Sequence, residues 1–494
     1  MRIESAELAR HGTAVRVRLA GGKSKLLRWI DLARVLGDPD PTASRMLDAR
    51  PAGDGLEVDL SGGSTWHLAP HHLVGPGDRQ IDLVVTTRGT LITCDDIACD
   101  DSGGPSTLAT LEGGVVLVGG GKIRWVGASK DVNRSGYDLA AAQHIDAGTR
   151  LISPGLVDCH AHPIFAGNRA DEFARRAAGQ TYQEIARAGG GIVATVHATR
   201  AADFDELVEA SCRRLDRALR SGTTTIEAKS GYDLTVDGEL RMLAVGQAID
   251  SLHAVDVETT LLGAHALPPE RADEREGYVA DCAGPMVAGA VRDELCRAID
   301  VYCDDGAFTL DEARHILSAG RAAGLAVRGH VGQFADLGCA ELVAELGGTS
   351  VDHVEQISDR GIRALAANSV VAVMLPGACV QLRMAPPPVA AMRAAGVAFA
   401  VATDMNPGSS LGETLPVQMW LATTHFGMSV EEAWLGVTRV AARVLARPDI
   451  GVLVPGATAD LVIWDAEHPA DIPYRYDRGA TLVSQVIKAG RLVG

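Results

Sequence analysis

Apolar, β-branched runs alternate with helix-patterned or loop segments through the middle of the chain. Seven of these runs are "GTTTIEA", "DVETTLLGAH", "IDVYCDD", "LAVRGHV", "TSVDHV", "VVAVMLPG" and "VAFAVATD". Short apolar runs separated by helical patterns are typical of parallel strands joined by helices. Together with the opening "LISPGLVDCHAH" they make eight runs, the number that a (β/α)8 barrel requires. We therefore predict an α/β fold with a (β/α)8 barrel over residues 151–447.

Short strand-like runs with glycine turns flank this region on both sides. They occur in residues 79–150, as in "GGVVLVGGGKIRWVGA", and again in residues 448–494, as in "GVLVPGATADLVIWDA". Because both flanks share this pattern, we expect them to pair into one β-sandwich domain. Residues 1–78 combine strand-like runs with a helical or polar middle and end in the linker-like "HHLVGPGDRQ", which predicts a small separate α+β unit.

Composition narrows the class of protein. A hydrophobic fraction of 47% in 494 residues excludes a largely disordered chain. The net charge of −17 would repel nucleic acid and anionic membranes, so we expect neither as a partner. The nine cysteines show no CxxC pair, and the amino-terminal sequence lacks a signal-peptide pattern. We therefore expect a cytoplasmic protein with reduced thiols.

Polar side chains follow the predicted strands at the points where these strands end. They are His160, His162, Glu227, Lys229, His265, Asp304, Asp305, His330, His353 and Asp404. In barrel enzymes the loops at the carboxyl ends of the strands converge on one mouth. The sequence therefore predicts the functional site at this end of the barrel.

The stretch "DCHAHPIFAGNR" predicts a metal site there. His160 and His162 are two residues apart, so on an extended strand their imidazoles point to the same side. This spacing alone is a weak signal, but His330, His353 and Asp404 end later predicted strands. Imidazoles with a carboxylate suit Zn²⁺ or iron when one position remains open for water. We expect one divalent or trivalent ion, zinc or iron.

Six motifs between residues 81 and 494 identify a known family. They are "PGLVDCHAHPIFAGNRADEF", "GQTYQEIARAGGGIVATVHATR", "EAKSGYDL", "LGAHALPPE", "AVMLPGA" and "ATDMNPGSS". The set resembles the imidazolonepropionases of the amidohydrolase superfamily, which open the ring of 4-imidazolone-5-propanoate to N-formimidoyl-L-glutamate in histidine degradation. The resemblance implies a cyclic-amide hydrolase with a small anionic heterocyclic substrate. We expect a homodimer, the commonest oligomer.

The resemblance also implies roles for individual residues. The implied metal ligands are His160, His162, His330 and Asp404. The implied substrate contacts are Arg169, Tyr182, Tyr232, His265, Gln333, Asn406, Gly408 and Ser409. A guanidinium such as that of Arg169 suits the propionate carboxylate. In catalysis we expect Asp404 to orient the attacking water and carry its proton, and His353 to hydrogen-bond the developing oxyanion. Gln333 would hold the water or a ring nitrogen.

Departures from the family pattern leave the ring compound open. They are Asp233 in "KSGYDL", Val331–Gly332 in "GHVGQ", and Cys379–Pro388. A hydantoin-like or purine-like ring, opened or deaminated, is an alternative substrate, and a metal-loaded binding protein without catalysis is a second alternative. Some amidohydrolases bridge two metals with a carboxylated lysine, but Lys229 follows the second predicted strand rather than the fourth. We interpret Lys229 and Glu227 as supports of a single-metal site.

Overall fold

A computed structural model describes most of the chain. The described residues are 3–9, 14–19, 24–28, 46–52, 55–60, 65–68, 80–95, 108–135, 137–180, 184, 190–476 and 482–493. Within them, no helix is long and apolar enough to cross a membrane.

Eight parallel strands form the predicted barrel. They are β14 (Leu156–Asp158), β15 (Thr223–Lys229), β16 (Asp256–Ala264), β17 (Ala298–Cys303), β18 (Ala326–Val331), β19 (Ser350–His353), β20 (Val371–Met374) and β21 (Phe399–Val401), paired in this order. A parallel bridge between Ala161 and Met405 joins the segments that follow the first and last strands. The strands are buried almost throughout, as the apolar runs predict for a parallel sheet covered on both faces. The (β/α)8 prediction is confirmed.

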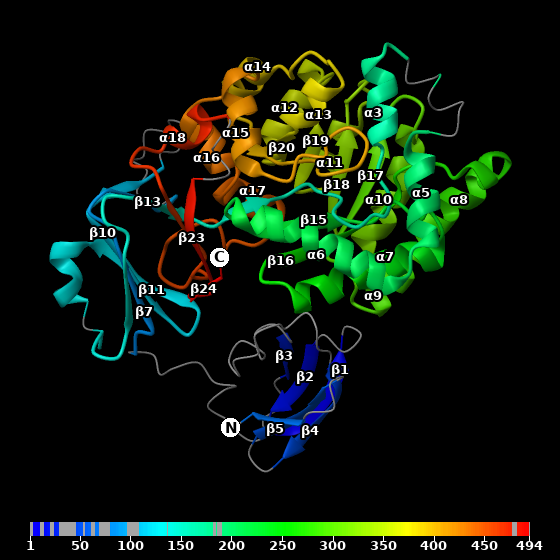
Figure 1. The fold of residues 1–494 in the computed structure, drawn as a ribbon. Coiled ribbons are helices and arrows are strands. Elements are labelled where there is room, and N and C mark those ends of the chain that lie inside the picture. The colour runs from blue at the N-terminus through cyan, green and yellow to red at the C-terminus, as the bar shows by residue number, and fades with distance from the viewer. Residues whose placement is uncertain are drawn as a thin grey trace.

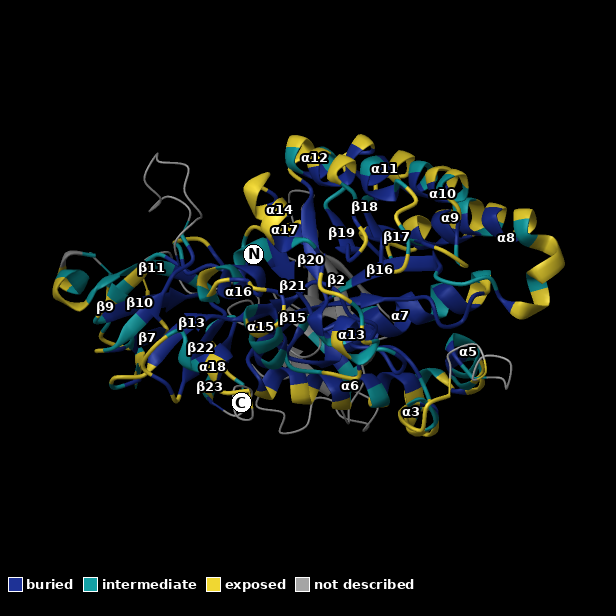
Figure 2. Ribbon diagram, turned by 90° about the horizontal axis from the view of Figure 1, so that it is seen from above, coloured by how far each residue is buried: buried dark blue, intermediate teal, exposed yellow. Residues whose placement is uncertain are grey.

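Helices surround the barrel strands, with buried residues on their inner sides and exposed residues on their outer sides (Figure 2). The helices of the described residues are α3 (Ala170–Ala177), α5 (Ile192–Ala201), α6 (Phe204–Arg220), α7 (Val236–Leu252), α8 (Arg275–Asp281), α9 (Val287–Arg292), α10 (Leu310–Ala322), α11 (Cys339–Glu345), α12 (Asp359–Asn368), α13 (Pro376–Gln381), α14 (Val389–Ala394), α15 (Leu415–Thr424), α16 (Val430–Gly436), α17 (Arg439–Val444) and α18 (Asp471–Tyr474), with short 3-10 helices at Ser129–Arg134 and Pro269–Glu274 and a π-helical segment at Cys282–Met286. The segment Ser129–Arg134 contacts strands outside the barrel. Capping boxes start three of the helices: Asp203 with Glu206, Thr309 with Glu312, and Ser429 with Glu432. These pairs satisfy the free backbone N–H groups of the first turn.

Two further sheets flank the barrel, and one of them combines strands that precede and follow the barrel in sequence (Figure 1). One has the order β11 (Lys122–Ala128), β10 (Gly114–Gly119), β7 (Leu83–Thr86), β12 (Gln143–Asp146). The other has the order β24 (Arg491–Leu492), β23 (Val483–Lys488), β22 (Leu461–Trp464), β13 (Leu151–Pro154), β8 (Thr90–Ile92), β9 (Thr110–Glu112). The antiparallel pair β13–β22 joins the two flanks of the sequence, with Leu151 opposite Trp464.

Alternating side chains of the flanking strands pack in two directions. Val116 and Val118 join the large core shared with the six-stranded sheet, whereas Val115 and Leu117 pack on the opposite face. This is the two-residue alternation of a sandwich strand. Trp464 anchors the sheets to the barrel helices, because its ring lies edge-on to Trp434 of α16 at 5.7 Å.

The amino-terminal region contains two three-stranded antiparallel sheets. They are β1 (Ile3–Ala9), β2 (Ala14–Leu19), β3 (Ser24–Arg28) and β4 (Met46–Ala52), β5 (Gly55–Leu60), β6 (Thr65–Leu68). The helical part of the predicted α+β unit falls within 29–45, outside the described residues.

Candidate active site

Three histidines and an aspartate meet at the carboxyl ends of the barrel strands. Ring nitrogens of His160, His162 and His330 lie within 4.8 Å of one another, and all three residues are buried. Asp404 Oδ1 lies 3.4 Å from His160 Nε2 and 3.6 Å from His162 Nε2. The structure thus brings together all four residues that the sequence predicts as metal ligands.

Backbone hydrogen bonds between the segments that follow the first and last barrel strands hold His160, His162 and Asp404 close together. Asp404 N donates to His160 O at 3.0 Å, and His162 N donates to Met405 O at 2.8 Å. Asp404 adopts a left-handed backbone with φ 48°, and His353 does so with φ 80°. Such conformations are strained for residues with a Cβ and gather at functional sites.

The unsatisfied nitrogens in this cluster fit a metal ion. His160 Nε2 and His330 Nε2 are buried and have no hydrogen-bond partner among the residues that the structure describes. Their other ring nitrogens are held by carboxylates: His160 Nδ1 lies 2.7 Å from Asp352 Oδ2, and His330 Nδ1 lies 3.0 Å from Asp300 Oδ2. Carboxylates behind the imidazoles fix the tautomer and ring orientation of metal-binding histidines.

Burial also shifts the pKa values of two residues of the cluster, His162 and Asp404. It lowers the pKa of His162 well below the usual range, so this imidazole is neutral and able to coordinate. Burial raises the pKa of Asp404 to about 7. A bound cation would favour the ionised form of this carboxylate.

Asp300 and Asp352 were not predicted from the sequence. Each is a single acidic residue inside an apolar strand, "AIDVYC" and "SVDH", and each is fully buried. An acidic residue in a buried strand is unusual without a partner. An aspartate within an apolar run is therefore the sequence feature that could have indicated these two residues. Their histidine partners lie on other strands, so spacing along the chain could not reveal the pairs.

Three of the implied substrate contacts lie around the metal cluster. The His265 ring stacks on that of His162, with centroids 5.1 Å apart. The Tyr232 ring lies 5.3 Å from that of His265. Gln333 Oε1 accepts a hydrogen bond from Tyr302 Oη at 2.8 Å, so Tyr302 is a further residue of the site.

The implied carboxylate contacts gather beside the turn after Asp404. Arg169 forms a bidentate ion pair with Glu172. A Cβ placed on Gly408 would lie 2.1 Å from Arg169 Nη1, so glycine makes room for the guanidinium. Asn406 Oδ1 accepts from the backbone N–H groups of Gly408 and Ser409, both at 2.8 Å. Asn406 therefore shapes this turn.

Tyr182 lies outside the described residues. Among the departures from the family pattern, Asp233 forms ion pairs with arginines of neighbouring helices. Its Oδ2 lies 3.2 Å from Arg241 Nη2, and its Oδ1 lies 3.7 Å from Arg200 Nε. Gly332 has φ 65°, which glycine adopts without strain. In the segment Cys379–Pro388, Gln381 Nε2 donates to Gly408 O at 3.2 Å, which links this departure to the turn that contains Asn406 and Gly408.

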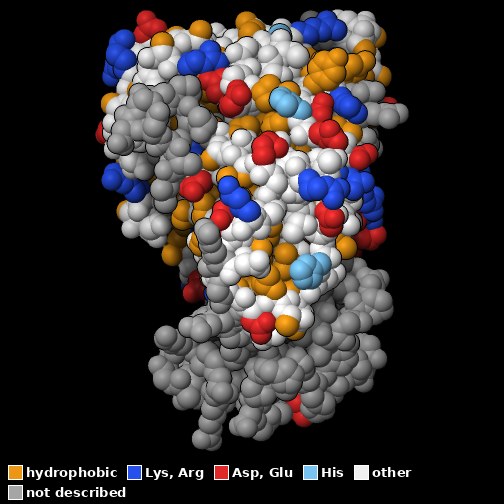
Figure 3. Space-filling view, turned by 90° about the vertical axis from the view of Figure 1, so that its left-hand side faces the viewer, with side chains coloured by type: hydrophobic (Ala, Val, Ile, Leu, Met, Phe, Trp, Pro, Cys, Tyr) orange, Lys and Arg blue, Asp and Glu red, His pale blue; other side chains and the backbone are white. Residues whose placement is uncertain are grey.

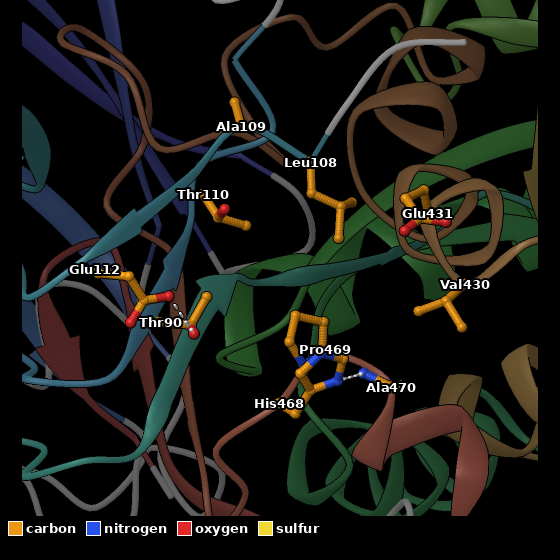
Figure 4. A pocket seen from close by; sticks show the side chains of 10 residues that line it. All are labelled: Thr90, Leu108, Ala109, Thr110, Glu112, Val430, Glu431, His468, Pro469 and Ala470. Atoms are coloured by element: carbon orange, nitrogen blue, oxygen red, sulfur yellow. Dashed lines mark hydrogen bonds between the residues drawn. The ribbon is translucent and has the colours of Figure 1, made fainter.

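A separate surface pocket lies between the flanking sheets and the start of α16 (Figure 4). Thr90 and Glu112, joined by a hydrogen bond, line one side, and Glu431 and His468 line the other. None of the residues that line it belongs to the histidine cluster.

A closed parallel barrel with buried histidines at its mouth defines an amidohydrolase, and the comparisons agree. The model of the amidohydrolase family matches residues 172–494, and the chain belongs to this family. Two solved structures share the fold with TM-scores of 0.61: E. coli guanine deaminase (15% identity, 83% of this chain and 99% of that chain) and a zinc-bound adenosine deaminase from Xanthomonas campestris (19% identity, 84% and 93%).

Relatives with higher identity place the chain within the family. It is 44% identical over 389 residues to the imidazolonepropionase of Paracoccus denitrificans, covering 78% of this chain and 94% of that relative. It is 45% identical over 370 residues to that of Rhizorhabdus wittichii, covering 74% of this chain and 92% of that relative. The chain is a member of the imidazolonepropionase group of amidohydrolases.

Proposed function

We propose that the protein hydrolyses the cyclic amide of 4-imidazolone-5-propanoate to N-formimidoyl-L-glutamate, a step of histidine degradation. The observation that carries the proposal is the pair of buried nitrogens His160 Nε2 and His330 Nε2, which have no hydrogen-bond partner within the described part of the chain, with Asp404 Oδ1 3.4 Å from His160 Nε2. They occur in a chain that is 44% identical to an imidazolonepropionase over 94% of that relative's length.

His160, His162, His330 and Asp404 would hold one metal ion, for which Zn²⁺ and iron are suited by this set of nitrogen and oxygen donors. When bound, such an ion polarises a carbonyl and lowers the pKa of water towards about 7. The described residues supply the rest of the chemistry.

The reaction adds the oxygen of water to the ring carbonyl carbon and breaks the bond from that carbon to the ring nitrogen. We assign Asp404 the transfer of the water proton to the leaving nitrogen. Burial lowers the pKa of His353 to about 3, so its imidazole is neutral at pH 7. A neutral N–H of His353 would donate to the carbonyl oxygen as negative charge develops there.

The other residues would bind and orient the substrate. Arg169 would bind the propionate, with Gly408 leaving the necessary space. Tyr232 and His265 lie against the metal cluster, where they would contact the ring. Because Tyr302 donates to the amide oxygen of Gln333, the Gln333 amino group is available as a donor to the ring or to water. Asn406, Ser409 and Tyr182 complete the proposed set.

We also propose that the protein acts in the cytoplasm as a homodimer, without nucleic acid or membrane partners. The net charge of −17 supports the absence of nucleic-acid and anionic-membrane partners, as does the mixture of acidic and basic side chains on the face drawn in Figure 3. All cysteines in the described ranges are free thiols, as expected in a reducing compartment. Size-exclusion chromatography with light scattering tests the dimer.

The experiment is a turnover assay on metal-reconstituted protein. Loss of ring absorbance, with the product identified by mass spectrometry, is expected for 4-imidazolone-5-propanoate. A hydantoin propionate and a purine serve as rival substrates, and ammonia is measured in parallel. Turnover of a rival without turnover of the imidazolone would overturn the proposed substrate. Ammonia release would indicate deamination.

A further inference from the structure

A second group of potential metal ligands lies directly behind the histidine cluster. Asp300, His330 and Asp352 offer ligand atoms within 4.8 Å of one another, and all are buried. Carboxylates arranged in this way can hold a cation without help from solvent.

The side chain of Lys229 already fills this position. Its Nζ lies 2.6 Å from Asp300 Oδ2, 2.9 Å from Glu227 Oε2 and 3.5 Å from Asp352 Oδ2. The side chains of all four residues are 0% exposed. The ammonium is a compact point charge with three donors, and here three carboxylates surround it.

We propose that Lys229 is a built-in cation that occupies a second cation site formed by Asp300, Asp352 and Glu227, and so restricts the centre to one metal ion. This inference deepens the proposed function and rests on its first metal site. Once the ammonium is removed, the second site would bind a divalent cation that carboxylate oxygens coordinate, such as Mn²⁺ or Zn²⁺.

The local charges favour this assignment. Asp300, Asp352 and Glu227 face two cations, Lys229 and Arg328, the latter paired with Glu227. Removal of the ammonium leaves three buried carboxylates with one guanidinium. Uncompensated buried charge is strongly unfavourable, so a divalent ion entering the vacated space would be stabilised.

The same ammonium supports the first site through its carboxylate neighbours. Asp352 contacts His160 Nδ1, and Asp300 contacts His330 Nδ1. By binding both carboxylates, Lys229 fixes the two oxygens that orient two ligands of the first metal. Lys229 is therefore a positioning residue, with no contact to the substrate required.

The test compares metal content in full-length protein after equilibration with excess Mn²⁺ and removal of free ion. Wild type is expected to retain about one ion per chain and Lys229→Ala about two. Electron paramagnetic resonance of the variant should show a spin-coupled Mn²⁺ pair. Lys488→Ala is the matched control, because Lys488 is also buried and held by Asp256 at 2.8 Å and Asp460 at 2.7 Å, in an ion pair without site residues. It should retain about one ion, as wild type does.

Two ions in wild type, one ion in folded Lys229→Ala, or a second ion in Lys488→Ala would each overturn the inference. The wild-type measurement holds even when the variant fails to fold. Turnover is measured separately: wild type with one ion but no imidazolone hydrolysis contradicts the proposed function alone, whereas wild type without any bound ion contradicts both.

Discussion

His353 Nδ1 lies 4.0 Å from Glu355 Oε2, and within the described part of the chain neither this nitrogen nor either Glu355 oxygen has a hydrogen-bond partner. Of the three imidazoles in the metal cluster, those of His160 and His330 have carboxylates in contact with Nδ1, whereas Nδ1 of His162 also has no hydrogen-bond partner among the described residues. His353 and Val354 both have left-handed backbone conformations, with φ of 80° and 64°. The backbone therefore turns just before Glu355. The arrangement keeps a buried carboxyl next to His353.

Glu355→Gln should stabilise the metal-free protein at pH 8. Burial, with added repulsion from Asp404 and Asp304, raises the pKa of Glu355 from 4.5 to about 8. Because the folded pKa is raised, the stability that Glu355 contributes is full below about pH 4.5 and is lost as the pH rises towards 8. Glutamine stays neutral, so its advantage grows over this interval, to ~2–4 kcal/mol.

Thermal unfolding of chelator-treated protein at pH 5 and pH 8 measures this effect. Glu345→Gln is the control, because Glu345 is an exposed partner of Arg314 and should change the melting temperature little. A lower melting temperature for Glu355→Gln than for wild type at pH 8 would contradict the assigned environment.

Asp352→Asn should weaken metal binding. The carboxylate behind His160 Nδ1 is replaced by an amide, which loses the charge that orients the imidazole. Outer carboxylates of this kind contribute about 10–100-fold in metal affinity. Competition with a chromophoric chelator measures the dissociation constant. Asp293→Asn, at an exposed pair with Arg292, should leave the constant unchanged, and an unchanged constant in Asp352→Asn would remove this role.

Gly408→Ala should raise KM by ~10-fold or more and change kcat less. The new Cβ would occupy space 2.1 Å from Arg169 Nη1, so the guanidinium must move away from the proposed propionate position. Loss of a charged hydrogen bond costs about 1.5–3 kcal/mol. Steady-state kinetics measures the split between KM and kcat. Gly284→Ala, with nothing within 4 Å of the added carbon, serves as control, and equal KM values in both variants would exclude the proposed contact.

Tyr302→Phe should lower kcat/KM by roughly 5–30-fold, because Gln333 loses the donor that fixes its amide. Tyr137→Phe removes a comparable hydroxyl bond, to Arg124 O at 3.1 Å in the flanking sheets, and should leave the kinetics unchanged. Wild-type kinetics in Tyr302→Phe would show that Gln333 needs no such support.

The sequence predicted the elements and ligands that depend on local patterns. Eight buried strands appear as apolar runs, and His160 and His162 share one segment with a two-residue spacing. The side-chain pairs that form only when the strands close into a barrel were not predicted. Lys229 and Asp300 are 71 positions apart, and no periodicity relates them. Likewise, β13 begins at Leu151, the predicted first residue of the barrel, yet it pairs with β22 in the flanking sheet. β13 and the first barrel strand, β14, are both short, buried and largely apolar, so only their hydrogen-bond partners show that they belong to different sheets.

The most direct test of the account is hydrolysis of 4-imidazolone-5-propanoate in heavy-oxygen water, with wild type and Asp404→Asn compared at equal metal content. The account predicts N-formimidoyl-L-glutamate that carries one solvent oxygen in its new carboxylate from wild type, and product formation at least ~100-fold slower from the variant. Equal rates for the two proteins, or no labelled product from metal-loaded wild type, would contradict it.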